Sequence, residues 1–260
     1  MPLTRRQFLG GLGSGIALGL GSSSVRSSQA AVDGQHIKAM AFDAFPVFDP
    51  RPIFAKAEAL FPGLGDRLSN EWRTRQFEYT WLRSLSHQYA DFWHVTEDAL
   101  VYAAHKLKLD LDSAKRAELM NGYLQLKPWP DVQQALNTIK SSGIRLAFLS
   151  NFTEDMLRSN IKSSSLDGIF DHILSTDGAK TYKPDPKAYQ LGVDALHADR
   201  DQIVFVAFAG WDAAGAAAFG YPTFWVNRLN SPLEELPSKP DGMGKDLNDL
   251  LSFIKDGDHR

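Results

Sequence analysis

The feature that most constrains the fold is an acidic residue at the end of an apolar run. Residues 37–42 read Ile-Lys-Ala-Met-Ala-Phe, and Asp43 follows them directly. A buried strand that ends in a carboxylate places an ionisable group at the carboxyl edge of a sheet, where open α/β folds bind ligands. A buried carboxylate is costly unless it is paired or used, so we expect Asp43 to be a nucleophile.

Three later segments also place polar residues at the ends of strand-like runs or between them. They are Ser150 and Asn151 after residues 144–149, Lys183 within residues 181–186, and Asp212 beyond residues 203–206. Each segment alone could be an ordinary strand-to-loop junction. Four such junctions in this order favour a common site at one edge of a parallel sheet.

The rest of the chain predicts an α/β fold with an insertion. Residues 53–126 have helical periodicity and no convincing strand, whereas strands and helices alternate from Trp129 onward. We therefore predict a Rossmann-like parallel sheet core with an inserted all-helical cap subdomain. The core comprises residues 36–50 and 128–260, and the cap comprises residues 51–127.

Several helix ends can be predicted from capping residues. Thr96 and Asp112 are the predicted starts of two cap helices, because each precedes or carries acids in a first turn. Residues 231–244 are rich in Pro and Gly, which predicts a surface loop. A last helix is expected from Asp246 to Ile254.

Composition excludes several kinds of protein. The chain has 260 residues and is 43% hydrophobic, which is sufficient for a packed core. The formal charge is −3 and the basic residues form no stripe, so no nucleic-acid partner is expected. The absence of cysteine excludes disulfides, thiolate metal ligands and a cysteine nucleophile.

Residues 1–30 resemble a twin-arginine export signal. Arg5 and Arg6 precede a short apolar region from Phe8 to Leu20, and Ser28-Gln29-Ala30 has the small residues of a cleavage site. A first core helix is the alternative, but the five glycines between Gly10 and Gly19 would each destabilise it by about 1 kcal/mol. We therefore expect a periplasmic protein with no stable membrane span after processing.

The mature chain resembles the type II L-2-haloacid dehalogenases of the haloacid dehalogenase superfamily. The resemblance covers residues 37–254 and rests on the segments that contain Asp43, Ser150, Lys183 and Asp212. It is made specific by the cap segment at residues 72–83, Trp-Arg-Thr-Arg-Gln-Phe-Glu-Tyr-Thr-Trp-Leu-Arg, because the core motifs alone would match any superfamily member.

The resemblance implies roles for the polar residues. Asp43 would displace halide from the α-carbon of a short (S)-2-haloacid and form an ester that water hydrolyses. Lys183 would keep Asp43 ionised, and Asp212 would hold Lys183 or position the water. Arg73 would meet the halide or the carboxylate, although outside the resemblance an arginine on a helix is ordinarily solvated. No cofactor or metal is implied.

Further residues would line the substrate pocket. Ser150 and Asn151 would donate hydrogen bonds to the substrate carboxylate, and Tyr189 would supply a pocket hydroxyl. An apolar wall that excludes water is assigned to Phe77, Phe92 and Trp211. Without the resemblance, these three aromatic residues would be read as core.

The chain departs from the family pattern around the nucleophile. Phe45-Pro46-Val47 stands where the dehalogenases have Tyr-Gly-Thr, and Ala207-Phe208-Ala209 stands where they have Ser-Ser-Asn. Loss of the Asn places the hydrolysis of the ester in question. Three outcomes stay open: a dehalogenase with a rearranged water site, a hydrolase of a different or more hydrophobic substrate, and a periplasmic protein that binds without turnover.

A phosphatase is disfavoured by the same segments. Phosphatases of this superfamily resemble Asp-x-Asp at the first strand and carry further acids near the last motif, which hold Mg²⁺. Here those positions are Phe45 and Ala207. The resemblance also implies a homodimer formed through the cap. The aromatic side chains of residues 79–93 would be buried either at that interface or against the core.

Overall fold

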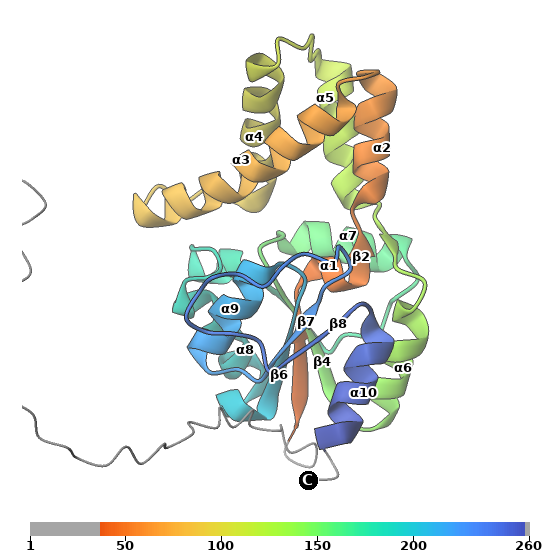
Figure 1. Cartoon of the computed structure of the whole chain (residues 1–260), viewed down its shortest axis with the longest axis vertical. Helices are drawn as coiled ribbons and strands as arrows, with labels where there is room; N and C mark the ends of the chain where they lie inside the picture. The colour runs from red at the N-terminus through yellow and green to blue at the C-terminus, as the bar shows by residue number, and fades with distance from the viewer. Residues whose placement is uncertain (1–36, 258–260) are drawn as a thin grey trace, which may run out of the picture.

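The protein is an α/β core with a helical cap, which confirms the predicted fold class (Figure 1). The structure, a computed structural model, describes residues 37–257. The proposed export signal therefore lies outside the described residues. The core strands are β1 Ala39–Phe42, β4 Arg145–Ser150, β5 His172–Ser175, β6 Ile203–Ala207, β7 Thr223–Val226 and β8 Gly242–Gly244.

All six strands run parallel in the order β5-β4-β1-β6-β7-β8. Strand β1 is therefore central, with β4 and β6 on either side. The order reverses next to β1, and such switch points create a crevice at the carboxyl ends of the strands. Asp43 directly follows β1 and lies at this crevice, as the sequence predicts.

Helices cover both faces of the sheet. Figure 1 shows α8 Pro186–Leu196 and α9 Gly210–Phe219 on one side, and α6 Val132–Ser141 and α10 Leu247–Gly257 on the other. Helix α7 Glu154–Ser163 packs near the cap side of the core. This arrangement buries the sheet on both faces, which is why its strands are almost continuously apolar.

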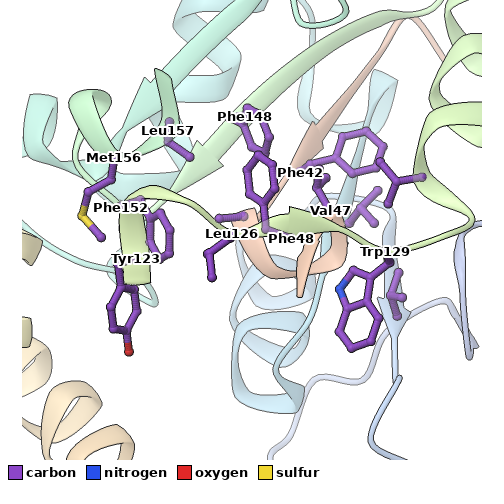
Figure 2. Packing of buried hydrophobic residues seen from close by; sticks show 14 of the residues in the cluster. Phe42, Val47, Phe48, Tyr123, Leu126, Trp129, Phe148, Phe152, Met156 and Leu157 are labelled. Carbon is purple, nitrogen blue, oxygen red and sulfur yellow. The ribbon is translucent and has the colours of Figure 1, made fainter. Parts of the chain in front are cut away.

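Side-chain alternation along β1 divides the core into two clusters. Met40 and Phe42 point into the larger cluster, whereas the smaller side chains of Ala39 and Ala41 face α8 and α9. In the larger cluster the rings of Phe48 and Phe148 stack with their centroids 5.6 Å apart. Figure 2 shows both side chains within this cluster.

The cap lies above the carboxyl edge of the sheet. Its helices are α2 Arg51–Leu60, α3 Gly65–Leu85, α4 Phe92–Lys106 and α5 Ser113–Asn121, followed by the short 3₁₀ turn Gly122–Leu124. The chain leaves the core through β2 Phe48–Asp49 and returns through β3 Lys127–Pro128. These two strands pair antiparallel and form the stem of the cap.

Two local predictions were wrong. Helix α4 begins at Phe92 rather than at Thr96, because the carboxylate of Asp91 accepts a hydrogen bond from the backbone N–H of His94 and caps the helix. The segment 231–244 is not all loop, since its last three residues form the edge strand β8. Asp112 caps α5, as predicted.

Candidate active site

The side chain of Asp43 is fixed at the start of a short helical turn. Its backbone N–H donates to the carbonyl of Val206 at 3.0 Å, and its Oδ2 accepts from the backbone N–H of Phe45 at 3.2 Å. The turn α1, Ala44–Val47, is thereby capped by the carboxylate itself. Asp43 is 8% exposed, so one face of the carboxylate stays accessible.

A buried ammonium joins Asp43 to Asp212. Lys183 Nζ donates to Asp43 Oδ1 at 2.9 Å and to Asp212 Oδ2 at 2.6 Å. The hydroxyl of Ser150 also donates to Asp43 Oδ1, at 3.0 Å. Tyr189 donates from its hydroxyl to Asp212 Oδ1 at 2.8 Å, so both oxygens of Asp212 are occupied.

The backbone of Lys183 is held by the neighbouring polar loop. Its N–H donates to Asn151 Oδ1 at 3.1 Å, and Thr176 Oγ1 donates to the same oxygen at 3.3 Å. The carbonyl end of Asn151 is thus fixed. Its amide group is the donor that the side chain can offer to a ligand.

The charges of this network follow from burial and pairing. Burial alone would lower the pKa of Lys183, but Asp212 and Asp43 outweigh burial and raise it, so the ammonium stays charged. Burial raises the pKa of Asp212 to about 6, with Lys183 opposing the rise and Asp43 adding to it. Burial and then Asp212 raise the pKa of Tyr189 well above its usual range, which keeps the phenol protonated.

A cleft of about 370 Å³ opens above these groups, between core and cap. That volume lies within the range of small-molecule sites. Asp43, Lys183 and Asp212 line the cleft. Ten aromatic side chains also line it: Phe45, Phe54, Phe77, Trp81, Phe92, Tyr123, Phe152, Phe208, Trp211 and Trp225.

Arg73 brings a positive charge to this cleft from α3. Its guanidinium lies 6.0 Å from the ring centroid of Phe54, and within residues 37–257 it forms no ion pair. The neighbouring Arg75, by contrast, pairs with Glu78 at 2.8 Å. Arg73 is therefore available to an anionic ligand.

The structure brings together nine of the ten predicted site residues. The nine that line the cleft are Asp43, Arg73, Phe77, Phe92, Ser150, Asn151, Lys183, Trp211 and Asp212. Tyr189 is a correction, because its ring is fully buried and does not reach the cleft. Its hydroxyl orients Asp212 instead of contacting a substrate.

The residues that depart from the dehalogenase pattern differ in whether they line the cleft. Ala209 lines the cleft, whereas Val47 and Ala207 are fully buried and do not line it. The apolar replacements that line the cleft are therefore Phe45, Phe208 and Ala209.

Sequence reasoning missed a clamp on the nucleophile turn. Arg228 donates to the carbonyl of Pro46 at 2.8 Å and forms a two-pronged ion pair with Asp131 at 2.9 Å. The indole of Trp129 donates to the carbonyl of Phe45 at 3.0 Å. No pattern in the sequence pairs residues this far apart, although Arg228 is the first charged residue after β7.

The described residues contain neither a metal-binding cluster nor a membrane-spanning helix. Within residues 37–257 no group of three His, Asp or Glu side chains is placed to hold a metal ion. No helix in this part of the chain is both long and apolar enough to cross a bilayer.

Known proteins with similar sequences are dehalogenases. The chain is 42% identical over 207 residues to an (S)-2-haloacid dehalogenase of Pseudomonas sp. (strain YL), covering 79% of this chain and 89% of that protein. It is 40% identical over 206 residues to haloacetate dehalogenase H-2 of Moraxella sp. (strain B), covering 79% and 92%.

Similar solved structures also include dehalogenases. The L-2-haloacid dehalogenase RSc1362 superposes with a TM-score of 0.83 at 43% identity, covering 84% of this chain and 99% of that one. The L-2-haloacid dehalogenase of Xanthobacter autotrophicus with chloropropionic acid covalently bound superposes with a TM-score of 0.78 at 32% identity, covering 84% and 98%. The family model for haloacid dehalogenase-like hydrolases matches residues 29–220. The chain therefore belongs to the haloacid dehalogenase-like hydrolases.

Proposed function

We propose that this protein hydrolyses the carbon–halogen bond of (S)-2-haloacids through an ester on Asp43. The observation that carries the proposal is the position of Asp43, whose carboxylate is paired with the buried ammonium of Lys183 at 2.9 Å and opens to an aromatic cleft. A charged nucleophile with few water contacts is suited to displacing halide. The relatives at 42% and 40% identity, both named dehalogenases, support the same reaction.

The first half-reaction is a displacement. An oxygen of Asp43 forms a bond to the α-carbon while the carbon–halogen bond breaks, and the halogen leaves with the bonding electron pair as halide. Arg73 faces the cleft without a carboxylate partner among the described residues, which suits it to hold the substrate carboxylate or the departing halide. Oδ2 of Asp43 is the better-placed attacking atom, because Oδ1 already accepts from Ser150 and Lys183.

The second half-reaction returns Asp43. Water adds to the carboxyl carbon of the ester, the bond between that carbon and the ester oxygen breaks, and a 2-hydroxy acid and a proton leave. Asp212 lines the cleft beside Lys183 and is the nearest buried carboxylate to this step. Because both of its oxygens are occupied, its first role is to position Lys183.

Halide release measures the reaction directly. The mature protein, incubated with (S)-2-chloropropionate and (S)-2-bromopropionate without added metal, is expected to release halide and form the 2-hydroxy acid. Asp43→Asn should abolish release while leaving the circular dichroism spectrum unchanged, because the amide is similar in shape but a poor nucleophile. Release by Asp43→Asn at the wild-type rate would remove Asp43 from the mechanism.

Metal dependence separates this proposal from a phosphatase. Phe45 and Ala207 stand where the superfamily's phosphatases would carry the further acids that help to hold Mg²⁺. A chelator should therefore leave the rate of halide release unchanged. A requirement for Mg²⁺, or hydrolysis of a phosphate monoester, would favour phosphoryl transfer.

Two further proposals concern the protein outside the site. We propose export to the periplasm, supported by Arg5-Arg6 and the apolar stretch that follows. We also propose a homodimer formed through the cap, supported by Leu82 and Leu85 on α3, which are 56% and 79% exposed. Sedimentation analysis of the mature protein tests the dimer, and a monomer across micromolar concentrations would exclude it.

Aromatic residues of the cap, for which a dimer interface and the core were both open, pack within the chain. Tyr89 stacks on Tyr182 with centroids 5.2 Å apart, and Trp81 packs against Trp211 at 5.5 Å. Support for a dimer therefore comes from the exposed leucines and not from these rings.

A further inference from the structure

Four phenylalanines form a continuous wall beside Asp43. Phe45 lies edge-on to Phe152 with centroids 5.2 Å apart, and 5.6 Å from Phe208. Phe152 in turn stacks on Phe92 at 5.5 Å. All four rings line the cleft, so this side of the site offers an extended apolar surface with no hydrogen-bonding group from these side chains.

Two of these rings occupy departures from the dehalogenase pattern. Phe45 stands where the family has Tyr, and Phe208 stands where it has the second Ser of Ser-Ser-Asn. Both are only partly buried, so they are exposed to whatever enters the cleft. The loss of hydroxyls here is therefore also a gain of apolar contact area for a ligand.

A second aromatic set joins the cap to the core. Trp211, on α9, packs against Phe77 at 5.3 Å and against Trp81 at 5.5 Å. Phe77 and Trp81 belong to α3, one turn apart on the face that meets α9. Like the first wall, these rings line the cleft, so apolar surface reaches it from both the core and the cap.

The cleft is large for a three-carbon acid. Its volume is about 370 Å³, which equals the space of about a dozen water molecules at about 30 Å³ each. A chloropropionate with its carboxylate near Arg73 and its α-carbon near Asp43 would leave much of the aromatic surface in contact with water. Replacing that water by an apolar group of the substrate is favourable, because it removes apolar surface from water.

We propose that the preferred substrates are 2-halocarboxylates with a large apolar substituent on the α-carbon, such as a benzyl group or a butyl chain. This inference rests on the proposed function. The reaction is unchanged: Asp43 bonds to the α-carbon as halide leaves, and water then releases the 2-hydroxy acid. The substituent lies on the wall formed by Phe45, Phe152 and Phe208, and its binding energy aligns the α-carbon with Asp43.

The test compares substrates that differ only in the substituent. Halide release is measured with (S)-2-bromopropionate, (S)-2-bromohexanoate and (S)-2-bromo-3-phenylpropionate, using wild type, Phe45→Leu, Phe208→Ala and the control Phe253→Ala. Phe253 belongs to α10 and packs on Phe224 of β7. It does not line the cleft. The readout is the ratio of kcat/KM between a large and a small substrate in one preparation, which is independent of the fraction of folded enzyme.

Wild type should favour the two larger substrates by about tenfold or more in kcat/KM. Phe208→Ala should lower that ratio by about tenfold and Phe45→Leu by less, while Phe253→Ala should leave it unchanged. Turnover of bromopropionate with equal or higher kcat/KM would overturn this inference and leave the proposed function intact. No halide from any of the three substrates would overturn the proposed function itself.

Discussion

At the scale of single residues, one buried lysine joins the nucleophile Asp43 to Asp212. Lys183 is 1% exposed and contacts two carboxylates, so it neutralises Asp43 only in part and shares its charge with Asp212. A buried ammonium with one carboxylate would be balanced, whereas this triad carries a net negative charge. Burial of that excess charge is why the pKa of Asp212 rises to about 6.

The raised pKa of Asp212 predicts how activity depends on pH. Below pH of about 6 the Asp212 carboxyl gains a proton and attracts Lys183 less strongly, so the ammonium loses its second anchor. We expect kcat to rise with pH through about 6 and then to level. Asp212→Asn should lower kcat and remove this step from the pH profile, as followed by halide release between pH 4.5 and 8.

An unchanged step in Asp212→Asn would assign the titration to another group. A matched control is Asp177→Asn, since Asp177 accepts from Tyr89 and Lys180 outside the cleft. The pH profile of this control should keep the wild-type step.

Ala209 predicts slow hydrolysis of the ester. Displacement requires a dry cleft and aligned groups, but hydrolysis requires an oriented water, and Ala209 offers no polar side chain to that water. We expect a burst of halide near one equivalent, with a covalent adduct on the peptide that contains Asp43, seen by intact-mass spectrometry and peptide mapping. Ala209→Asn should accelerate the slow phase by about 10² and leave the burst rate nearly unchanged.

Absence of both burst and adduct would mean that a backbone group or Asp212 already orients the water. Ala207→Ser is the matched control for this prediction. Because Ala207 is fully buried and does not line the cleft, the added hydroxyl should not accelerate the slow phase.

The polar residues of the site could be predicted from sequence, but some of their partners could not. Asp43, Ser150 and Lys183 follow or lie between strand-like runs, and parallel strands bring such residues to one edge. Tyr189 was assigned to the pocket from the family resemblance, whereas the register of α8 turns its ring into the core. Phe152 was missed because nothing in a sequence separates a pocket ring from a core ring.

At the scale of elements, the helical turn α1 that follows the nucleophile is too short to be stable through its own hydrogen bonds. It spans only four residues, one of which is Pro46. Trp129 and Arg228 donate to the carbonyls of Phe45 and Pro46 at 3.0 and 2.8 Å. The turn that follows Asp43 is thus held by two neighbouring side chains that are more than 80 residues away from it along the chain.

Breaking this clamp should affect both stability and rate. Arg228→Met leaves Asp131 buried without its partner, and breaking a buried ion pair destabilises a protein by about 3–5 kcal/mol. We also expect kcat to fall by up to about 10², because the carbonyl of Pro46 loses its donor and Asp43 shifts. Chemical denaturation measures the first effect, and halide release below the unfolding transition measures the second.

Arg51→Met is the matched control for the clamp. The Arg51 guanidinium also lies over the Trp129 ring, at 4.5 Å, but its ion pair with Asp49 is on the surface, with 64% of the arginine side chain exposed. Its loss should cost at most about 1 kcal/mol. Equal effects from both variants would show that contact with Trp129, and not the carbonyl of Pro46, determines the result.

At the scale of the whole molecule, the order of helices and strands could be predicted from the sequence. The contacts between cap and core could not. Alternating periodicity from Trp129 onward indicated the parallel sheet, and the long helical stretch before it indicated the cap. The contact between α3 and α9 through Trp211 depends on how two subdomains pack. Phe77 and Trp211 are 134 positions apart in the sequence, so no local pattern predicts their contact.

The paired arginines Arg5 and Arg6 predict where the folded molecule is delivered. The twin-arginine route transports folded proteins, and a chain with no cysteine needs no oxidising compartment to fold. Residues 1–31 fused to a fluorescent reporter should therefore direct it to the periplasm, and Arg5→Lys with Arg6→Lys should keep it in the cytoplasm. Cell fractionation measures the distribution, and the control Arg26→Lys, outside the paired arginines, should be exported normally. Retention of the unmodified fusion in the cytoplasm would exclude export by this route.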